Sequence, residues 1–102
     1  MKNKYKRVRK FVVANSKKET FAILRILCGP MRFKIILVLG KYRNGLIVSR
    51  LADILGSSLS RVSHQLRILK KYNLVEAKKI NRETLYRLAN HRIRKFLKIL
   101  FF

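Results

Sequence analysis

Acidic residues are scarce in this sequence. Only four occur among 102 residues, namely Glu19, Asp53, Glu76 and Glu83, against 26 lysines and arginines, so the formal net charge is +22. Charge of one sign at this density repels itself and opposes compaction unless a polyanion compensates it. A surface that is merely solvated usually mixes both signs. The composition therefore predicts a polyanionic partner, with nucleic acid favoured over an anionic membrane surface.

Cysteine and long apolar runs are equally rare. The single cysteine, Cys28, excludes an intramolecular disulfide and indicates a reducing compartment. The apolar-rich tail FLKILFF, residues 96–102, is far shorter than the ~20 residues that a membrane span needs. The N-terminus is a basic arm without a long apolar run behind it, so no signal peptide is predicted. We expect a cytoplasmic protein that is associated with the nucleoid and not with a membrane.

The residue patterns of catalytic and metal sites are also missing. The four acids are scattered, and neither a Ser-His-acid set nor a Gly-rich phosphate loop occurs, so an enzyme is not predicted. Only Cys28, His64 and His91 could serve as soft metal ligands, and they lie far apart in the sequence, so no metal or other cofactor is expected. Cys28 is predicted to be a small buried apolar residue because no second cysteine could resolve an oxidised thiol. His91 is interpreted as structural.

The length fits one domain preceded by an arm. We place a basic N-terminal arm at residues 1–16 and the domain at residues 17–102. Eight lysines and arginines fall within residues 1–18. Tyr5, Val8 and Val12 recur at helical spacing, so part of the arm could form a helix, while a disordered tail that contacts phosphates fits the first residues equally well.

Four successive segments have helical periodicity, over residues 17–28, 30–42, 46–55 and 58–72. Pro30 suits the first turn of the second helix, Gly56 ends the third, and Ser57 or Ser58 can cap the fourth. The expected inward residues are Phe33, Ile36, Leu37 and Leu39 or Gly40 in the second helix, Ile47, Leu51, Ile54 and Leu55 in the third, and Val62, Leu66 and Leu69 in the fourth.

After residue 73 the apolar period shortens. Residues 74–80 and 84–88 are rich in β-formers and flank a turn, which predicts a two-stranded hairpin. The chain returns to helix from Asn90. Two helices joined by a short turn and followed by a hairpin are typical of a winged helix-turn-helix. The fold expected is therefore mainly α with a small β-hairpin, with about five helices and a two-stranded wing.

The fourth helix has a polar outer face of mixed chemistry. With Val62 pointing inward and about 100° per residue, Ser60, His64, Arg67 and Lys71 point most directly outward, with Arg61 and Ser63 on the flanks. Such a face can donate and accept hydrogen bonds at base edges in the DNA major groove. DNA contact is the favoured interpretation of the arginines and the histidine together, whereas each serine alone fits capping as well as contact.

The hairpin adds cations near its tip that fit contacts to the DNA backbone or minor groove. The predicted DNA-binding residues are Ser58, Ser60, Arg61, Ser63, His64, Gln65, Arg67 and Lys71 of the helix, and Lys78, Lys79 and Arg82 of the hairpin.

Two segments carry a resemblance to a known family. LCGPMRFKIILVL, residues 27–39, resembles the Leu-x-x-Pro-x-Arg-x-x-Ile-Leu entry of ArsR-type winged-helix regulators. Residues 51–88 are similar to their helix-turn-helix and wing, including the Val-Ser-His-x-Leu core of the reading helix. The similarity covers roughly residue 21 to the C-terminus. It implies a homodimer, built on the first and last helices, that binds operator DNA near a promoter.

The dimer is also supported by an apolar stripe on the last helix that one small core would not cover. The residues assigned to the interface are Phe21, Leu24, Ile93, Phe96, Leu97, Leu100 and Phe101. Metal-sensing members of the family carry Glu-Leu-Cys-Val-Cys-Asp-Leu at the start of the third helix, where residues 45–51 read Gly-Leu-Ile-Val-Ser-Arg-Leu here. The resemblance therefore implies a regulator without the metal-binding cysteines.

Two functions stay open. The varied polar face of the fourth helix favours a sequence-specific dimeric transcription regulator, most simply a repressor that blocks a promoter. The net charge favours an architectural, nucleoid-type protein that coats double-stranded DNA with little sequence preference, because excess charge supplies mainly phosphate affinity.

Overall fold

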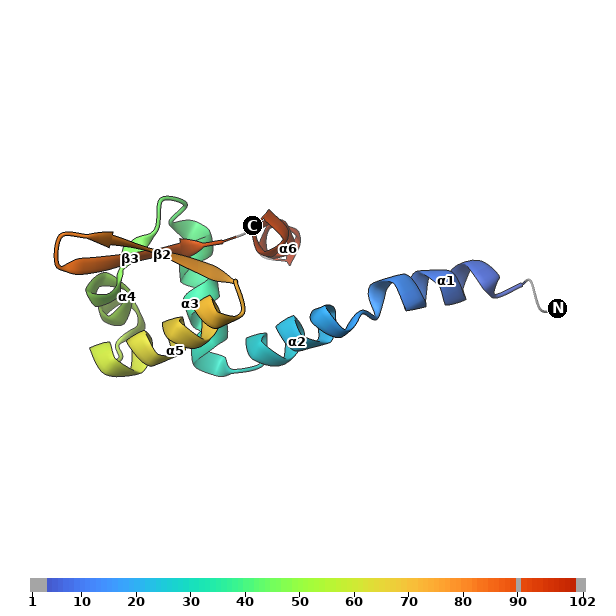
Figure 1. Cartoon of the computed structure of the whole chain (residues 1–102), viewed down its shortest axis with the longest axis horizontal. Coiled ribbons are helices and arrows are strands. Elements are labelled where there is room, and N and C mark those ends of the chain that lie inside the picture. The colour runs from blue at the N-terminus through green and yellow to red at the C-terminus, as the bar shows by residue number, and fades with distance from the viewer. Residues whose placement is uncertain (1–3, 90, 101–102) are drawn as a thin grey trace.

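The computed structural model describes residues 4–89 and 91–100, with all their side chains except those of four residues, Glu19, His91, Arg92 and Leu100. The chain forms helices around a small antiparallel sheet with the strand order β1-β3-β2 (Figure 1). The helices are α1 (Lys6–Asn15), α2 (Lys18–Leu27), α3 (Pro30–Lys41), α4 (Val48–Leu55), α5 (Leu59–Lys71) and α6 (His91–Leu100). The strands are β1 (Leu46–Ile47), β2 (Val75–Ile80) and β3 (Glu83–Leu88). This architecture confirms the expected winged helix-turn-helix.

The described residues form one helix and one strand more than the sequence predicted. The additional helix is α1, which forms in the basic arm, and the additional strand is β1, which the sequence placed at the start of a helix. Gly45 explains the strand, because its φ is +91° and a Cβ there would lie 2.6 Å from the carbonyl oxygen of Tyr86. The chain therefore runs directly against β3, where Leu46 pairs with Tyr86 and Ile47 pairs with Leu85. Edge pairing overrides the helical periodicity of these two residues.

The core is centred on α3, which contacts α2, α4, α5, α6 and β3. Ile35, Ile36 and Leu39 are fully buried there. Of the alternatives Leu39 and Gly40, Leu39 is therefore the inward residue. Phe33 and Leu37 are only partly buried, although Leu37 packs against the core. A helix surrounded by several elements buries more than one stripe, so its periodicity does not single out the innermost residues.

The inward face of α4 also differs from the expectation. Leu51 and Ala52 are buried, whereas Leu55 and Ile47 are only partly buried and Ile54 is 48% exposed. Ile47 lies in β1, before the start of α4, so it does not belong to the inward face of that helix.

The ends of α4 and α5 follow the sequence signals. Gly56 adopts the left-handed conformation, with φ +60° and ψ +37°, and ends α4. The Ser58 hydroxyl accepts a hydrogen bond from the Arg61 N–H at 3.2 Å, so Ser58 is the cap of α5. The hairpin turns at Asn81 and Arg82, with Asn81 at φ +58°, a conformation that asparagine tolerates better than most residues. Strand β3 begins one residue earlier than predicted, because Glu83 pairs with Ile80.

Helix α1 projects from the body of the molecule, whose principal extents are 63 × 23 × 23 Å (Figure 1). It buries none of its residues. Cys28, which follows α2, is exposed, so its predicted burial was wrong. The core-facing side of α2 is formed instead by Ile26, with Ile23 and Leu27 beside it. None of the described helices is long and apolar enough to cross a membrane.

Candidate nucleic-acid interface

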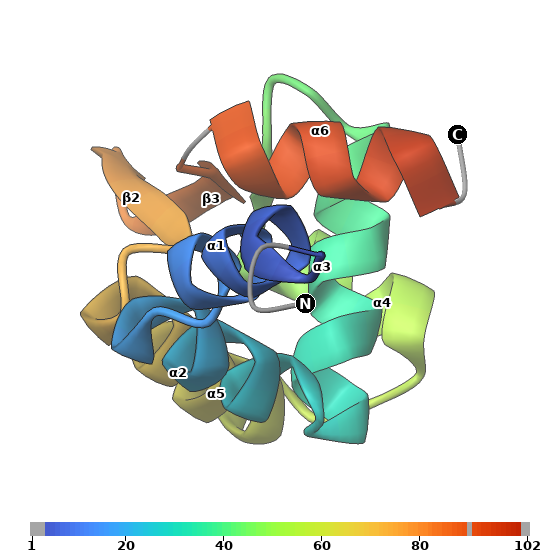
Figure 2. The ribbon, with the colours of Figure 1, turned by 90° about the vertical axis from the view of Figure 1, so that its right-hand side faces the viewer.

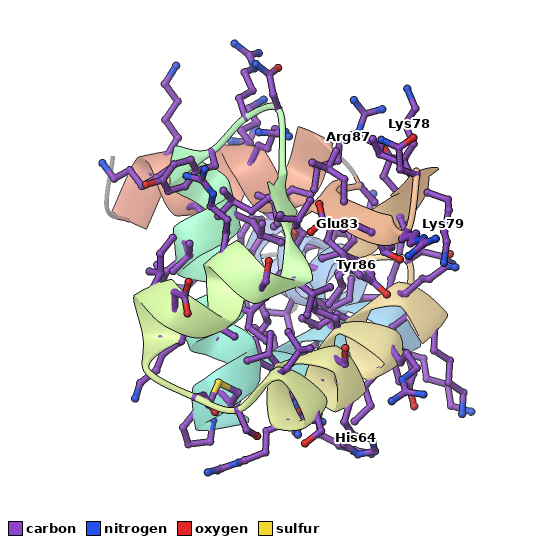
Figure 3. All side chains as sticks on the ribbon, turned by 90° about the vertical axis from the view of Figure 1, so that its left-hand side faces the viewer. His64, Lys78, Lys79, Glu83, Tyr86 and Arg87 are labelled. Carbon is purple, nitrogen blue, oxygen red and sulfur yellow. The ribbon has the colours of Figure 1, made fainter. Side chains whose placement is uncertain are left out.

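Helix α5 is held in one rotation by its buried side. Val62, Leu66 and Leu69 are fully buried, so the opposite side must face away from the body. Among the polar residues predicted to contact DNA, Ser60, Arg61, His64, Arg67 and Lys71 are exposed, while Ser63 and Gln65 are partly buried at the flanks. Figure 3 shows the His64 side chain pointing away from the body at its edge. The predicted outer face is therefore available to a ligand.

The start of α5 combines capping with an accessible surface. The Ser58 hydroxyl caps the helix and lies 3.4 Å from the Ser60 hydroxyl. For Ser58 the capping interpretation is thus confirmed. Met31, at the start of α3, borders the same surface and was not predicted. A shallow pocket of about 350 Å³ is lined by Met31, Ser60, Arg61, His64 and Gln65.

The wing does not present its cations on one face. Lys78 pairs with Leu85 and Lys79 with Thr84, and successive strand residues point to opposite sides of a sheet. Figure 3 shows the two lysine side chains diverging, with Lys79 on the side of α5. Arg82 is exposed in the turn. Lys79 and Arg82 are thus better placed than Lys78 to join the surface of α5.

An acid lies between α5 and the tip of the wing. Glu83 lines a pocket of about 240 Å³ together with Ser63 and Arg82. Ser49, in the first turn of α4, and Thr84 line it as well. Ser49 and Thr84 were not predicted because neither stands out in the hydrophobic pattern of the sequence, and the pocket forms only where the wing folds back toward α5. A carboxylate here opposes the binding of phosphate.

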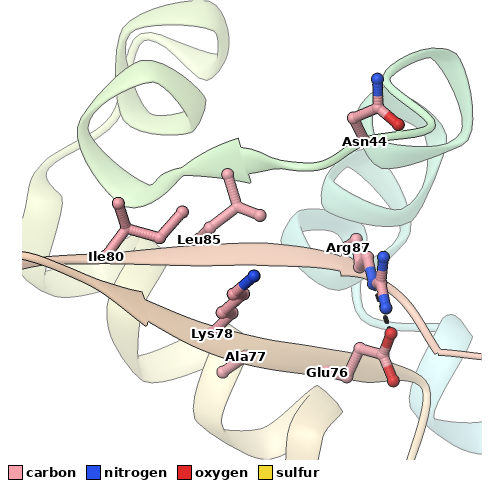
Figure 4. Close-up of a pocket in the computed structure, with 7 residues that line it drawn as sticks. All are labelled: Asn44, Glu76, Ala77, Lys78, Ile80, Leu85 and Arg87. Carbon is pink, nitrogen blue, oxygen red and sulfur yellow. Dashed lines mark hydrogen bonds and ion pairs between the residues drawn. The ribbon is translucent and has the colours of Figure 1, made fainter.

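The outer face of the sheet has a different character. The Arg87 guanidinium donates a hydrogen bond to the Glu76 carboxylate directly across the β2–β3 pair (Figure 4). The pair borders a pocket of about 420 Å³ whose other lining residues are Asn44, Ala77, Lys78, Ile80 and Leu85. Because Glu76 neutralises Arg87, this face attracts a polyanion less strongly than the exposed surface of α5 does.

The residues assigned to a dimer interface divide into two groups. Phe21, Leu24 and Phe96 are exposed large apolar residues, as the assignment requires, and Phe96 is 39% exposed. Ile93 and Leu97 are buried in the core of the single chain, where Leu97 is 1% exposed, so the assumption that the core leaves them uncovered was wrong. Helix α6 contacts α3. Phe101 and the side chain of Leu100 lie outside the described residues.

The titratable groups of the described side chains do not gather into a metal site. No three His, Cys, Asp or Glu side chains within this part of the chain lie together as metal ligands would.

The sequence of residues 29–77 matches the family described as "Bacterial regulatory protein, arsR family". The chain is 38% identical over 71 residues to the HTH-type transcriptional repressor SmtB of Mycobacterium tuberculosis, covering 70% of this chain and 51% of that protein. It is 36% identical over 75 residues to the HTH-type transcriptional regulator NmtR of the same organism, covering 72% and 60%. The chain thus spans between half and three fifths of the length of these relatives.

Solved structures of regulators share the fold. The transcriptional repressor BigR from Xylella fastidiosa superposes with a TM-score of 0.80 at 22% identity, covering 91% of this chain and 92% of that one. The transcriptional regulator HlyU from Vibrio vulnificus superposes with a TM-score of 0.76 at 26% identity, covering 89% and 92%. The homodimeric winged helix-turn-helix DNA-binding domain Mb0332 from Mycobacterium bovis, a possible ArsR-family regulator, has a TM-score of 0.72 at 23% identity, covering 90% and 81%.

Proposed function

Because this chain carries an ArsR-family helix-turn-helix domain, we propose that it is a dimeric DNA-binding transcription regulator that acts as a repressor. It reads the major groove with α5, while the β2–β3 wing contacts the backbone or the minor groove. The observation that carries this proposal is the fixed rotation of α5. Three fully buried residues anchor one side of the helix, and a polar side with varied donors and acceptors faces out.

The chemistry of that polar side supports sequence reading. Arginine can donate two hydrogen bonds to the O6 and N7 atoms of guanine, and shorter polar side chains can contact either strand. Arg61, His64 and Arg67 are exposed on one helix, within reach of successive base pairs. Lys79 and Arg82 of the wing would then contact phosphates, which positions the domain without specifying sequence.

The dimer is proposed from two observations. The neighbour from Mycobacterium bovis is described as homodimeric. In this chain, Phe21 and Leu24 of α2 and Phe96 and Ile99 of α6 are exposed, and large apolar residues on a surface commonly mark a protein interface. Two copies related by a two-fold axis would place two α5 helices on successive major grooves, about 34 Å apart.

The alternative is an architectural protein that coats duplex DNA. The +22 charge favours it, and so does α1, whose four lysines and arginines stand away from the core. Such an arm adds affinity for phosphates in any sequence.

Selection of bound fragments from random duplex DNA, followed by sequencing, decides between the two functions. A regulator enriches one pseudo-palindromic motif, and its affinity for that motif exceeds its affinity for random duplex by about a thousandfold or more at moderate salt. An architectural protein enriches no motif, and the ratio stays near unity. That second result would overturn the proposed reading role of α5.

A further inference from the structure

Met31 is the apolar member of an otherwise polar pocket beside α5. The pocket of about 350 Å³, which we name the α3–α5 pocket, is lined by Met31 together with Ser60, Arg61, His64 and Gln65. We propose that the α3–α5 pocket recognises an A·T base pair, with Met31 in contact with the methyl group of the thymine. This inference rests on the proposed entry of α5 into the major groove, and it adds a base pair and the residues that distinguish it.

The position of Met31 is fixed by the core. Helix α3 begins at Pro30, directly before Met31, and both Ile35 and Leu39 are fully buried. Residues four apart lie on the same side of a helix, so Met31 continues the stripe of Ile35 and Leu39 toward the surface. Its side chain is partly buried against the core, and α3 contacts α5. The part of Met31 that lines the pocket therefore has a defined place beside α5.

The α3–α5 pocket borders the exposed side of α5. Ser60 and His64, which line it, are both exposed. Figure 2 shows α5 and the start of α3 together at the end of the body away from α6, so a partner chain on the exposed side of α6 would leave the pocket open. The border of α5 toward the wing differs in charge, because Glu83 lines the pocket there. DNA that binds along the exposed side of α5 would therefore meet an apolar group at one border and an acid at the other.

The lining of the α3–α5 pocket matches the edge of an A·T pair. In the major groove thymine presents a methyl group at C5, which an apolar side chain can contact. Methionine suits such a contact because its long side chain is flexible and its sulfur is polarisable. The amide of glutamine can donate to N7 of adenine and accept from its N6 amino group, and Gln65 lines the same pocket. A G·C pair offers neither the methyl group nor this arrangement of donor and acceptor.

The proposal is tested on the duplex motif that selection identifies. Each thymine in turn is replaced by deoxyuridine, which removes only the C5 methyl group, and binding of the full chain is followed by fluorescence anisotropy. We expect one thymine in each half-site at which the replacement weakens binding about fourfold, as for the loss of one buried methyl group. A motif in which no replacement weakens binding would overturn the proposal and leave the reading role of α5 in place. Failure to select any motif would overturn both.

Matched variants assign the methyl contact to Met31. Met31→Ala should bind the thymine and deoxyuridine duplexes equally, whereas Met31→Leu, which keeps an apolar side chain of similar volume, should keep most of the fourfold ratio. Leu59→Ala is the control, because Leu59 is an exposed apolar residue at the border of α5 toward the wing, and it should keep the ratio as well. A ratio that survives in Met31→Ala, or that is lost in Leu59→Ala, would contradict the proposal. If circular dichroism shows that Met31→Ala does not fold, Met31→Gln replaces it with the same expectation.

The adenine of the same base pair tests the assignment of Gln65. Replacing this adenine by 7-deazaadenine removes the N7 acceptor and should weaken binding of the unmodified chain about fivefold, as for the loss of one hydrogen bond. Gln65→Ala should bind the two duplexes equally. An unmodified chain that does not respond, or a response that persists in Gln65→Ala, would overturn the assignment of an A·T pair to this pocket.

Discussion

Helices α1 and α5 carry four lysines and arginines each but relate to the core in opposite ways. In α5 three residues are fully buried, whereas in α1 none is. The core therefore fixes which side of α5 faces out, and that side can hold a defined set of contacts. Because no residue of α1 is buried, packing on the described core does not fix the rotation of α1. Under the proposed function, two helices of equal charge therefore have different roles, with α5 reading a sequence and α1 attracting phosphates.

The apolar residues of α1 and α5 also differ in their burial. Val8, Phe11 and Val12 are exposed, and Phe11 is 66% exposed. In α5 the equivalent apolar stripe is the part that packs on the body. Apolar residues of α1 would be covered in the same way only if another chain packed on them, which agrees with the proposed dimer.

The largest effect is expected from removing the anchor of α5. Leu66→Ala should lower the free energy of unfolding by about 2–5 kcal/mol, because it leaves a cavity at a fully buried position. Urea denaturation followed by circular dichroism measures the loss. Leu59→Ala is the matched control, since Leu59 lies on the same helix and is 55% exposed. Equal losses in the two variants would contradict the anchoring of α5.

Removing the charge of α1 should affect all DNA sequences alike. We expect binding to preferred and random duplexes to weaken about a hundredfold at moderate salt in the quadruple variant Lys6→Gln, Arg7→Gln, Arg9→Gln and Lys10→Gln. The variant makes fewer phosphate contacts, so fewer counterions are released when it binds. Fluorescence anisotropy at several salt concentrations measures both affinities.

The salt dependence provides the control for that variant. We expect a log–log slope for the unmodified chain that reflects about six to ten neutralised phosphates per dimer, and a shallower slope for the variant. An unchanged slope would mean that α1 does not contact DNA. A selective loss on the preferred duplex would mean that the arm takes part in reading.

The dimer prediction concerns exposed apolar residues. Phe96→Ala should raise the dissociation constant of the dimer about tenfold, since a buried aromatic residue commonly contributes more than 1 kcal/mol to an interface. Lys95→Ala, an exposed neighbour on the same helix, should change it little. Sedimentation equilibrium measures both. A chain that is monomeric at micromolar concentration would remove the dimer.

The smallest effect is expected at the acid between α5 and the wing. Glu83→Gln should strengthen binding to random duplex about threefold at low salt, because it removes a repulsion to phosphate, and the gain should shrink as salt rises. Glu76→Gln is the control, because Glu76 lies on the outer face of the sheet, paired with Arg87. A larger gain for Glu76→Gln would place the DNA on the outer face.

Most of the features that were predicted correctly from the sequence depend on short-range signals. Gly56, Ser58 and the spacing of Val62, Leu66 and Leu69 each act within one turn of helix, and the structure has them as predicted. The errors came from contacts between distant segments. Leu46 and Ile47 follow a helical period but pair with β3, and the position of Glu83 beside Ser63 depends on the folding of the wing. Cys28 was predicted to be buried as a small apolar residue, yet it is exposed, and Ile26, Ile23 and Leu27 form the core-facing side of α2.

The reading role of α5 is tested most directly by comparing Arg61→Ala with Lys10→Ala on a selected duplex and on a random one. Both changes remove one positive charge, so both should weaken binding to the random duplex by a similar small factor. Arg61→Ala should in addition lower the ratio of selected to random affinity about tenfold or more, corresponding to about 1–3 kcal/mol for a base contact, while Lys10→Ala leaves the ratio unchanged. A ratio that falls equally, or not at all, in both variants would contradict the account.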